Sequence, residues 1–292
     1  MSRGILYIAT GETFLKESKV SAESLKEYND LEVAVITSSE FRGSEHDLTV
    51  FDDVIYIEQE KLFADLRDKV RNIDATIYEK TVFLDTDTYV LGDLSPMFDI
   101  LEKVDLVAAH APVRPLVSLS DVPDTFPELN TGVLGYCSNE GTHKLFQKWK
   151  RIHKDQLKNG RPNERVTLKG VDRLENLASF GRMHDQPPFR EALYKSDVRF
   201  CALPREYNFR GSGTAYGRVK VLHMGHGIKG KRVKKSINKD THVRTYVDQR
   251  GKVFFENGKN ERISYKLIER AYKHDRLNPL FNLLKTYKSR WL

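Results

Sequence analysis

Short apolar runs that stop abruptly at polar residues recur along the first part of the chain. A continuous run of this kind is typical of a strand that is buried on both faces. The runs cover residues 5–9, 31–36, 54–57, 81–84, 106–109 and 132–136. Because helical patterns separate several of these runs, the sequence predicts an α/β protein with a doubly wound sheet.

Helical patterns of apolar residues lie between the first strands. One helix is predicted through Ala22 and Leu25, with Ser21 as its N-cap. A second helix is predicted over residues 62–70, where apolar residues recur at helical spacing. Ligands of doubly wound sheets bind where the strands end, so polar residues at those points are the first candidates for a site.

The pattern changes in the last part of the chain. Residues 246–255 predict a hairpin, and residues 261–273 and 280–291 predict amphipathic helices. We therefore expect an α/β domain over residues 1–228, followed by a C-terminal extension over residues 229–292.

Charge distinguishes this extension from the domain. The whole chain has a formal net charge of +7, with 48 Lys and Arg against 41 Asp and Glu. Residues 229–292 contain 18 of the basic residues and 6 of the acidic ones, a net charge of +12, so the first 228 residues carry −5. A split of this kind indicates an anionic partner for the extension, such as lipid, nucleic acid or an acidic glycan.

The apolar faces of the extension narrow the choice of partner. Apolar and basic residues side by side suit peripheral contact with an anionic membrane, and they equally suit docking on the domain with the charges in solvent. Nucleic acid is disfavoured, because no aromatic residue interleaves with the basic run over residues 229–239.

Composition and cysteine content predict a cytoplasmic protein. Apolar residues make up 39% and charged residues 30%, as expected of a globular protein. No stretch reaches the roughly 18 apolar residues of a membrane span, and the first apolar run is too short for a signal peptide. Cys137 and Cys201 lack metal-ligand spacing and are predicted to be buried free thiols in a reducing compartment.

Two carboxylates follow the strand predicted over residues 81–84. Asp85 and Asp87 are separated only by Thr86, so both can reach one hard cation in the loop beyond the sheet. Mg²⁺ and Mn²⁺ bind in this way through a few carboxylates and the oxygens of a diphosphate. A solvated turn also accommodates two acidic residues, but the position at a strand end favours a metal site.

A second polar cluster follows the apolar segment over residues 219–222. His223 and His226 are candidate metal ligands, the adjacent glycines let the backbone approach a phosphate, and Lys229 adds positive charge for a diphosphate. A surface turn rich in His and Gly would have the same composition. Together with the pair of aspartates, the cluster favours a site for a metal and a diphosphate.

Two further segments carry polar groups that suit a sugar. Asn130 can hydrogen-bond sugar hydroxyls and Gly132 permits close approach, although a loop entering a strand would have this composition too. Asp185 could be the N-cap of a helix over residues 190–195, with two prolines rigidifying its first turn. That role leaves Gln186 unexplained.

In this order and spacing, the segments resemble GT-A glycosyltransferases of the glycogenin and lipopolysaccharide galactosyltransferase type, glycosyltransferase family 8. The resemblance covers about residues 4–229. It rests on six features in chain order. They are Ala-Thr-Gly at residues 9–11, a basic residue upstream of the acidic strand, Asp-x-Asp at 85–87, Asn-Thr-Gly at 130–132, Asp-Gln at 185–186, and His223 followed by Lys229. It implies a Rossmann-like mixed sheet and transfer of a sugar from a nucleotide-diphosphate donor, a UDP-sugar by default, to a glycan, lipid-linked or protein acceptor.

The resemblance also implies roles for individual residues. The residues implied to hold Mn²⁺ or Mg²⁺ are Asp85, Asp87 and His223. The residues implied to bind the donor are Ala9, Thr10, Gly11, Lys69, Thr86, Thr131, Gly132 and Lys229. Arg67 and Arg71 compete with Lys69 for the upstream basic position.

Three residues are implied to line the sugar pocket and take part in catalysis: Asn130, Asp185 and Gln186. Relatives with Asp-Gln here usually retain the anomeric configuration, which would place Gln186 on the β-face of the donor sugar. Glutamine is a poor nucleophile, so front-face attack through an oxocarbenium-like transition state is expected. Catalysis would then depend on positioning and on stabilisation of the leaving group.

The sequence departs from the family pattern at two points. His226 stands where glycine is usual, and the loop after the first strand lacks the common Asp and Tyr, so the base of the nucleotide stays open. Three other classes fit less well. A haloacid-dehalogenase-type phosphatase would have Thr or Val where Tyr89 stands, and a sugar nucleotidyltransferase would have a Gly-rich basic loop after the first strand. A non-catalytic, transferase-like binding module would not need all three metal ligands.

Overall fold

The structure is a computed structural model, and it describes the larger part of the chain. The described residues are 2–43, 46–58, 64–112, 117–119, 121–159, 165–166, 184–210, 213–223, 228–239, 245–247 and 252–255. The helices predicted over residues 261–273 and 280–291 lie outside the described residues, as does His226.

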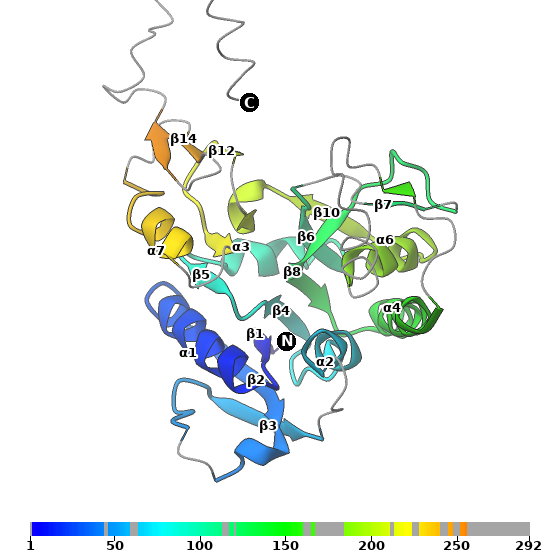
Figure 1. The fold of residues 1–292 in the computed structure, drawn as a ribbon, viewed down its shortest axis with the longest axis horizontal. Helices are drawn as coiled ribbons and strands as arrows, with labels where there is room; N and C mark the ends of the chain where they lie inside the picture. Colours follow the sequence, from blue (N-terminus) through cyan, green and yellow to red (C-terminus); the bar gives the residue numbers. More distant parts are fainter. Residues whose placement is uncertain are drawn as a thin grey trace, which may run out of the picture.

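A seven-stranded mixed sheet forms the centre of the molecule, in the order β10-β6-β8-β4-β1-β2-β3 (Figure 1). Its strands are β1 (Arg3–Ile8), β2 (Glu32–Ser38), β3 (Asp53–Ile57), β4 (Lys80–Leu84), β6 (Leu106–His110), β8 (Leu129–Cys137) and β10 (Phe200–Leu203). β8 is antiparallel to both of its neighbours, and all the other pairs are parallel. The predicted α/β architecture with a doubly wound mixed sheet is therefore confirmed.

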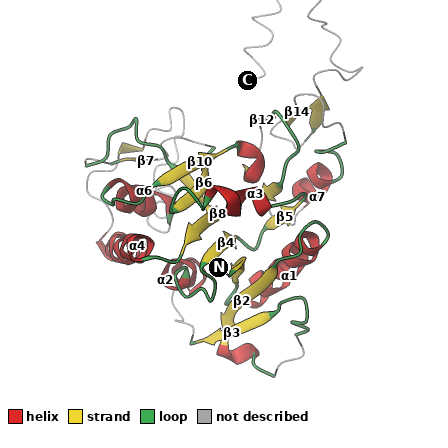
Figure 2. Ribbon diagram, turned by 180° about the vertical axis from the view of Figure 1, so that it is seen from behind, coloured by secondary structure: helices red, strands yellow, loops and turns green. Residues whose placement is uncertain are grey.

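Helices cover both faces of this sheet (Figures 1 and 2). α1 (Glu12–Lys26) and α3 (Ser95–Ile100) lie on one face, and α2 (Ala64–Asn72), α4 (Glu140–Asn159) and α6 (Gln186–Tyr194) lie on the other. Along β1, Ile5 and Tyr7 enter the core on the first side, and Leu6 and Ile8 enter the core on the second. Burial on both faces explains why the strand is apolar without alternation.

Two small sheets stand beside the main one. The first has the order β11-β13-β5 and consists of β5 (Thr88–Val90), β11 (Phe209–Arg210) and β13 (Val221–His223). The second has the order β12-β14-β15 and consists of β12 (Gly213–Ala215), β14 (Thr245–Val247) and β15 (Val253–Phe255). Because β14 and β15 pair antiparallel, the hairpin predicted over residues 246–255 is confirmed.

The start of the extension packs against the preceding part of the chain. β14 pairs with β12, and α7 (Ile228–Lys234) contributes Val233 to a core that also contains Tyr89, Phe209 and Val247. The choice between membrane contact and docking concerns the helices predicted over residues 261–273 and 280–291, which lie outside the described residues. The proposed division between residues 228 and 229 stays a prediction.

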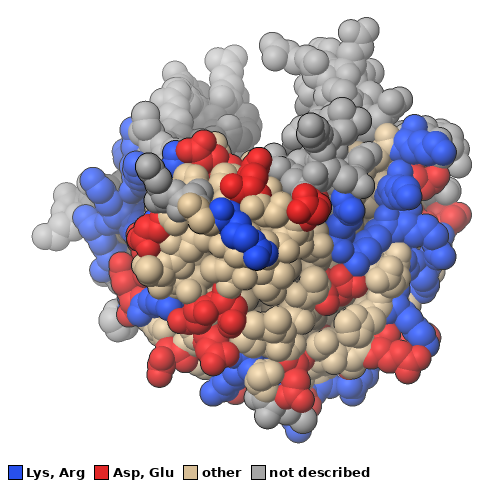
Figure 3. Space-filling view, turned by 90° about the horizontal axis from the view of Figure 1, so that it is seen from below, with Lys and Arg blue, Asp and Glu red and all other residues tan. Residues whose placement is uncertain are grey.

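Four short elements complete the described chain: the 3₁₀ helices η1 (Ser39–Phe41) and η2 (Arg205–Tyr207) and the paired strands β7 (Val117–Ser118) and β9 (Arg165–Val166). No helix among the described residues is both long and apolar enough to cross a membrane. Acidic and basic side chains are interspersed on the face shown in Figure 3. Cys137 and Cys201 are free, as predicted, but they are half-buried rather than buried.

Two helix predictions need correction, and one helix was missed. Ser21 is not an N-cap, because α1 already begins at Glu12 and Ser21 lies buried within it, bonded to the Thr88 hydroxyl at 2.7 Å. The helix predicted over residues 190–195 begins earlier, at Gln186. The 20-residue helix α4 was not predicted at all. Its apolar residues Leu145, Phe146 and Trp149 have helical spacing and are fully buried, so the signal was present in the sequence.

Candidate active site

A cavity of about 570 Å³ opens at the edge of the sheet where β1 and β4 end. β8 runs in the opposite direction, so its first residues arrive at the same edge. The predicted site residues that line the cavity are Thr10, Lys69, Asp85, Thr86, Asp87, Asn130, Thr131, Gly132, Asp185, Gln186 and His223. Segments far apart in the sequence therefore meet in one place.

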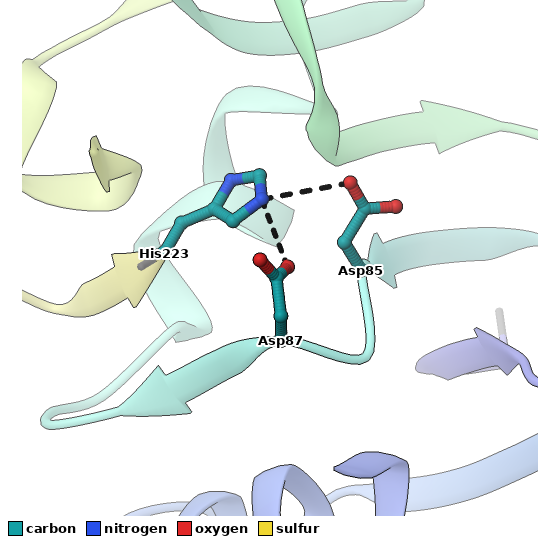
Figure 4. Close-up of side chains that lie close together, drawn as sticks. All are labelled: Asp85, Asp87 and His223. Carbon is teal, nitrogen blue, oxygen red and sulfur yellow. Dashed lines mark ion pairs between the residues drawn. The ribbon is translucent and has the colours of Figure 1, made fainter. Parts of the chain in front are cut away.

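Asp85, Asp87 and His223 form a compact group of metal-ligating side chains (Figure 4). Asp85 follows β4, Asp87 precedes β5, and His223 ends β13, which pairs with β5. His223 Nε2 lies 3.0 Å from Asp87 Oδ1 and 3.6 Å from Asp85 Oδ2, and one ligand atom from each residue lies within 4.8 Å of the other two. Two carboxylates and an imidazole nitrogen suit a divalent cation such as Mn²⁺, or Mg²⁺.

The charge state of this group suits a cation. Burial raises the pKa of Asp87, but the hydrogen bond and charge of His223, together with the charges of Arg210 and Lys69, outweigh it and lower the pKa to about 2. Asp87 is therefore ionised at neutral pH and can act as a ligand without first losing a proton.

Gly132 makes room for this group. A Cβ atom at position 132 would lie 2.6 Å from Asp85 Oδ2 and would collide with the ring of His223. The backbone carbonyl of the same residue accepts a hydrogen bond from the Asp85 amide at 2.7 Å. Glycine is therefore required here because two of the candidate metal ligands pack against its backbone.

A buried lysine joins the metal group to the proposed sugar pocket. Lys69 Nζ lies 2.9 Å from Asp85 Oδ1 and 3.0 Å from Asp185 Oδ2, and Asp185 Oδ2 also accepts a hydrogen bond from the Thr131 hydroxyl at 2.7 Å. Burial lowers the pKa of Lys69, but Asp185 and Asp85 outweigh it and raise the pKa. Burial raises the pKa of Asp185, but Lys69 first, then His184 and Thr131, hold it well below its usual range.

The geometry excludes a capping hydrogen bond from the Asp185 side chain. The residue occupies the N-cap position of α6, but its side chain makes no capping hydrogen bond. The carboxylate turns instead towards Lys69 and Thr131, and its backbone carbonyl accepts a bond from the Trp149 indole at 2.9 Å. The helix end thus fixes the position of Asp185 while its charge is directed towards the cavity.

Asn130 and Gln186 are directly bonded to each other. Asn130 lies inside β8 rather than in a loop before it, and its Nδ2 donates to Gln186 Oε1 at 2.5 Å. Both side chains are buried, with exposed fractions of 2% and 6%. Neither residue is free to reorient without breaking this bond.

The cavity also includes residues that sequence reasoning missed. Phe14 and Glu17 reach it from α1, His184 from the segment before α6, and Arg210 from β11, next to His223 in the sheet. The Glu17 carboxylate accepts a hydrogen bond from the Thr86 hydroxyl at 3.2 Å. Phe14 and Glu17 precede Ala22 in α1, so a correct start for that helix would have pointed to them.

A buried hydroxyl stands at the end of β1. Thr10 is only 2% exposed, and its Oγ1 has no hydrogen-bond partner among the described residues. Because a buried hydroxyl without a partner is costly, this atom is suited to bonding a polar ligand in the cavity.

The remaining predicted residues have other positions. Ala9 is buried in the core and Gly11 directly precedes α1, so both flank Thr10 without lining the cavity. Arg71 is 45% exposed and lies near Asp68, whereas Lys69 lines the cavity. The side chains of Arg67 and Lys229 lie outside the described residues.

Comparison with known proteins identifies similar structures but no family. No family model matches the chain, and no curated protein is similar to it in sequence. Among solved structures, glycosyltransferase GlyE of Streptococcus pneumoniae TIGR4 is 19% identical, with 72% of this chain matched and a TM-score of 0.46. The matched part spans only 47% of GlyE.

Two other similar structures are also described as glycosyltransferases. The galactosyltransferase LgtC, in complex with donor and acceptor sugar analogues, is 14% identical, with 71% of this chain and 75% of LgtC covered and a TM-score of 0.47. Mouse xyloside xylosyltransferase 1 is 14% identical, with 76% of this chain and 97% of that protein covered and a TM-score of 0.47. These identities and TM-scores describe a similarity of fold. The function is therefore inferred from the site.

Proposed function

We propose that the protein is a metal-dependent glycosyltransferase. It transfers a sugar from a nucleotide-diphosphate donor, a UDP-sugar by default, to a glycan, lipid-linked or protein acceptor. The observation that most supports this proposal is the group of Asp85, Asp87 and His223, whose ligand atoms lie within 4.8 Å of one another at the carboxyl edge of a doubly wound sheet.

The donor set fits a divalent cation that binds a diphosphate. Mn²⁺ or Mg²⁺ would be held by Asp85, Asp87 and His223, and when bound it would neutralise charge on the leaving diphosphate. Arg210 brings a further positive charge to this side of the cavity, since it acts electrostatically on Asp87 and lines the same space. We assign Arg210 to the diphosphate, a role for which Lys229 remains a second candidate.

The part of the cavity lined by Asp185, Asn130 and Gln186 suits the sugar. In the proposed reaction, the bond between the anomeric carbon and the diphosphate oxygen breaks, and the oxygen keeps the electron pair. The acceptor hydroxyl forms the new bond on the same face, and its proton passes to the leaving oxygen. The ionised Asp185 carboxylate is suited to stabilising positive charge at the anomeric carbon, while Asn130 and Gln186 hold the sugar in place.

Calorimetric titration of UDP into the protein, with Mn²⁺ and then with EDTA, tests the proposal. We expect binding with Mn²⁺ that disappears with EDTA. Asp87→Ala should weaken binding by about 100-fold or more, because loss of even an outer-shell partner costs about 10–100-fold in metal affinity. Asp53→Ala, which removes an exposed aspartate at the start of β3, is the matched control.

Two outcomes would contradict the proposal in different ways. Unchanged, Mn²⁺-dependent binding of UDP by folded Asp87→Ala would show that the aspartates are not the metal site. Tight binding of UDP without hydrolysis or transfer from any UDP-sugar would instead indicate the non-catalytic binding module. If UDP does not bind under either condition, GDP is the next nucleotide to titrate.

A further inference from the structure

A continuous row of buried polar side chains runs from the far side of the sugar pocket to the metal group. It consists of Glu128, Gln186, Asn130, Asn208 and His223, called the amide relay below. The exposed fractions of these residues lie between 1% and 6%. Consecutive members are joined by hydrogen bonds of 3.3, 2.5, 2.8 and 2.9 Å.

The carboxylate at one end determines which atoms of the amides donate. An ionised carboxylate only accepts hydrogen bonds, so Gln186 presents its Nε2 to Glu128 Oε1. Its Oε1 is then left to accept from Asn130 Nδ2. The guanidinium of Arg190, which is buried and interacts electrostatically with Glu128, favours a negative charge at this end.

A second, independent donor fixes the middle of the relay. The backbone amide of Gly132 donates to Asn130 Oδ1 at 3.0 Å, and a backbone amide can only donate. Asn130 Oδ1 is therefore an acceptor whatever the state of Glu128. Asn208 must turn its Nδ2 towards this oxygen, at 2.8 Å, and this leaves Asn208 Oδ1 facing His223.

At the last bond of the relay, between Asn208 and His223, only one choice of donor is then consistent. Asn208 Oδ1 has no proton to give, so His223 Nδ1 must carry the proton and donate it at 2.9 Å. In the protonated ring Nε2 donates to Asp87, whereas in the neutral ring the proton held on Nδ1 leaves a lone pair on Nε2, the atom that faces Asp87 and Asp85. Without the relay, Asp87 would favour the opposite tautomer, with the proton on Nε2, where it would occupy the coordination position.

We propose that Asn208 is a positioning residue that keeps the Nε2 lone pair of His223 available to a metal. Asn208 directly follows the 3₁₀ helix η2 and precedes β11, and no motif in the sequence marked it. This inference depends on the proposed function only in taking Asp85, Asp87 and His223 as metal ligands. The relay also joins both amides of the sugar pocket to His223, so one set of hydrogen bonds orients the two parts of the site.

The tautomer of His223 tests the relay in the metal-free protein. The measurement is a long-range ¹H–¹⁵N spectrum of histidine-labelled protein, at a pH high enough for the ring to be neutral. We expect the proton on Nδ1 in the natural protein and a shift towards Nε2 in Asn208→Leu. Asn208→Asp keeps an acceptor for Nδ1 and should keep the natural tautomer. A proton on Nε2 in the natural protein, or the same tautomer in Asn208→Leu, would overturn the proposal.

Mn²⁺ affinity provides a second readout that needs no sugar donor. Titration of Mn²⁺ alone, followed by the electron paramagnetic resonance of the free ion, should show 10–100-fold weaker binding in Asn208→Leu, as expected when an outer-shell partner is lost. Asn238→Leu is the matched control, because Asn238 makes two amide hydrogen bonds of 2.9 Å with the backbone of Val219, outside the cavity.

The combined results separate this inference from the proposed function. Equal Mn²⁺ affinity in the natural protein and in folded Asn208→Leu would overturn the role of Asn208 and leave the metal site standing. If the natural protein does not bind Mn²⁺, the proposed function loses its metal site, and the tautomer spectra still decide whether the relay orients His223.

Discussion

On the wall of the cavity formed by β8 and α6, polar side chains are bonded to one another. On the wall formed by the end of β1 and by α1, the buried Thr10 hydroxyl has no partner among the described residues. The first wall holds Lys69, Asp185 and the amide relay in fixed orientations before any ligand arrives. Under the proposed function, the β8–α6 wall would position the reacting groups, and the β1–α1 wall would gain its missing hydrogen bond from the donor.

Removal of Lys69 should have the largest effect on stability, because Lys69 holds the side chains of the β8–α6 wall in place. Lys69→Met leaves the carboxylate of Asp185, whose side chain is 8% exposed, without its ion-pair partner. We expect the free energy of unfolding to fall by about 3–5 kcal/mol at neutral pH, as when one partner of a buried ion pair is removed. Lys150→Met removes a lysine from a more exposed pair with Asp74 and should cost clearly less.

The pH dependence of this loss distinguishes an ion pair from simple packing. The pKa of Asp185 is lowered in the folded protein, so its stabilising contribution is present above the unfolded value of about 3.9 and is lost as the pH falls. In Lys69→Met, burial raises that pKa instead, and Asp185 becomes neutral as the pH falls. Urea unfolding should show the gap between the two proteins narrowing towards about pH 4; a constant gap would contradict the ion pair.

A methyl group at position 132 should have the next largest effect. Gly132→Ala forces a Cβ against His223 and Asp85, and overpacking of this kind costs about 1–3 kcal/mol of stability. Because the displaced groups are the candidate ligands, Mn²⁺ binding should be lost even where the protein remains folded. Gly217→Ala, whose Cβ would meet no atom within 4 Å, is the control. Normal Mn²⁺ affinity in Gly132→Ala would argue against this metal site.

The smallest effect is expected for a substitution in the β1–α1 wall. Thr10→Val removes the unpartnered hydroxyl and should leave the unfolding free energy unchanged or slightly higher, while UDP binding weakens by about 1 kcal/mol, or roughly fivefold. In the neighbouring strand, Thr37 donates to the Ala9 carbonyl at 2.8 Å, so Thr37→Val should lose about 1 kcal/mol of stability. Equal UDP affinity in the natural protein and in Thr10→Val would show that this hydroxyl does not contribute to UDP binding.

Much of the framework could be predicted from sequence, because it depends on local patterns. Continuous apolar runs identified the strands of the main sheet that lead into the site. The position of Asp85 and Asp87 after one of these strands followed directly. The direction of β8 did not follow from its apolar pattern, which is the same for a parallel and an antiparallel buried strand.

The residues that escaped prediction are brought in by tertiary packing. Asn208 precedes the two-residue strand β11 and Arg210 ends it, and the pairing of β11 with β13 brings them next to His223. Glu128 lies directly before β8, where a single acidic residue has no distinguishing pattern. The start of α1 was misplaced because Ser21 is a good N-cap by type, yet in the fold its hydroxyl bonds to Thr88 across the core.

The register of the antiparallel strand β8 determines which of its residues contact each part of the candidate site. The hydroxyl of Thr131 donates a hydrogen bond to Asp185, the partner of Lys69. Its neighbours on either side have other contacts: Asn130 belongs to the amide relay, and the backbone of Gly132 packs against His223 and Asp85. A register error of one residue between β8 and β4 would exchange these two sets of positions, because successive side chains point to opposite faces. A shift of β8 by one residue would therefore displace both sets of contacts at once.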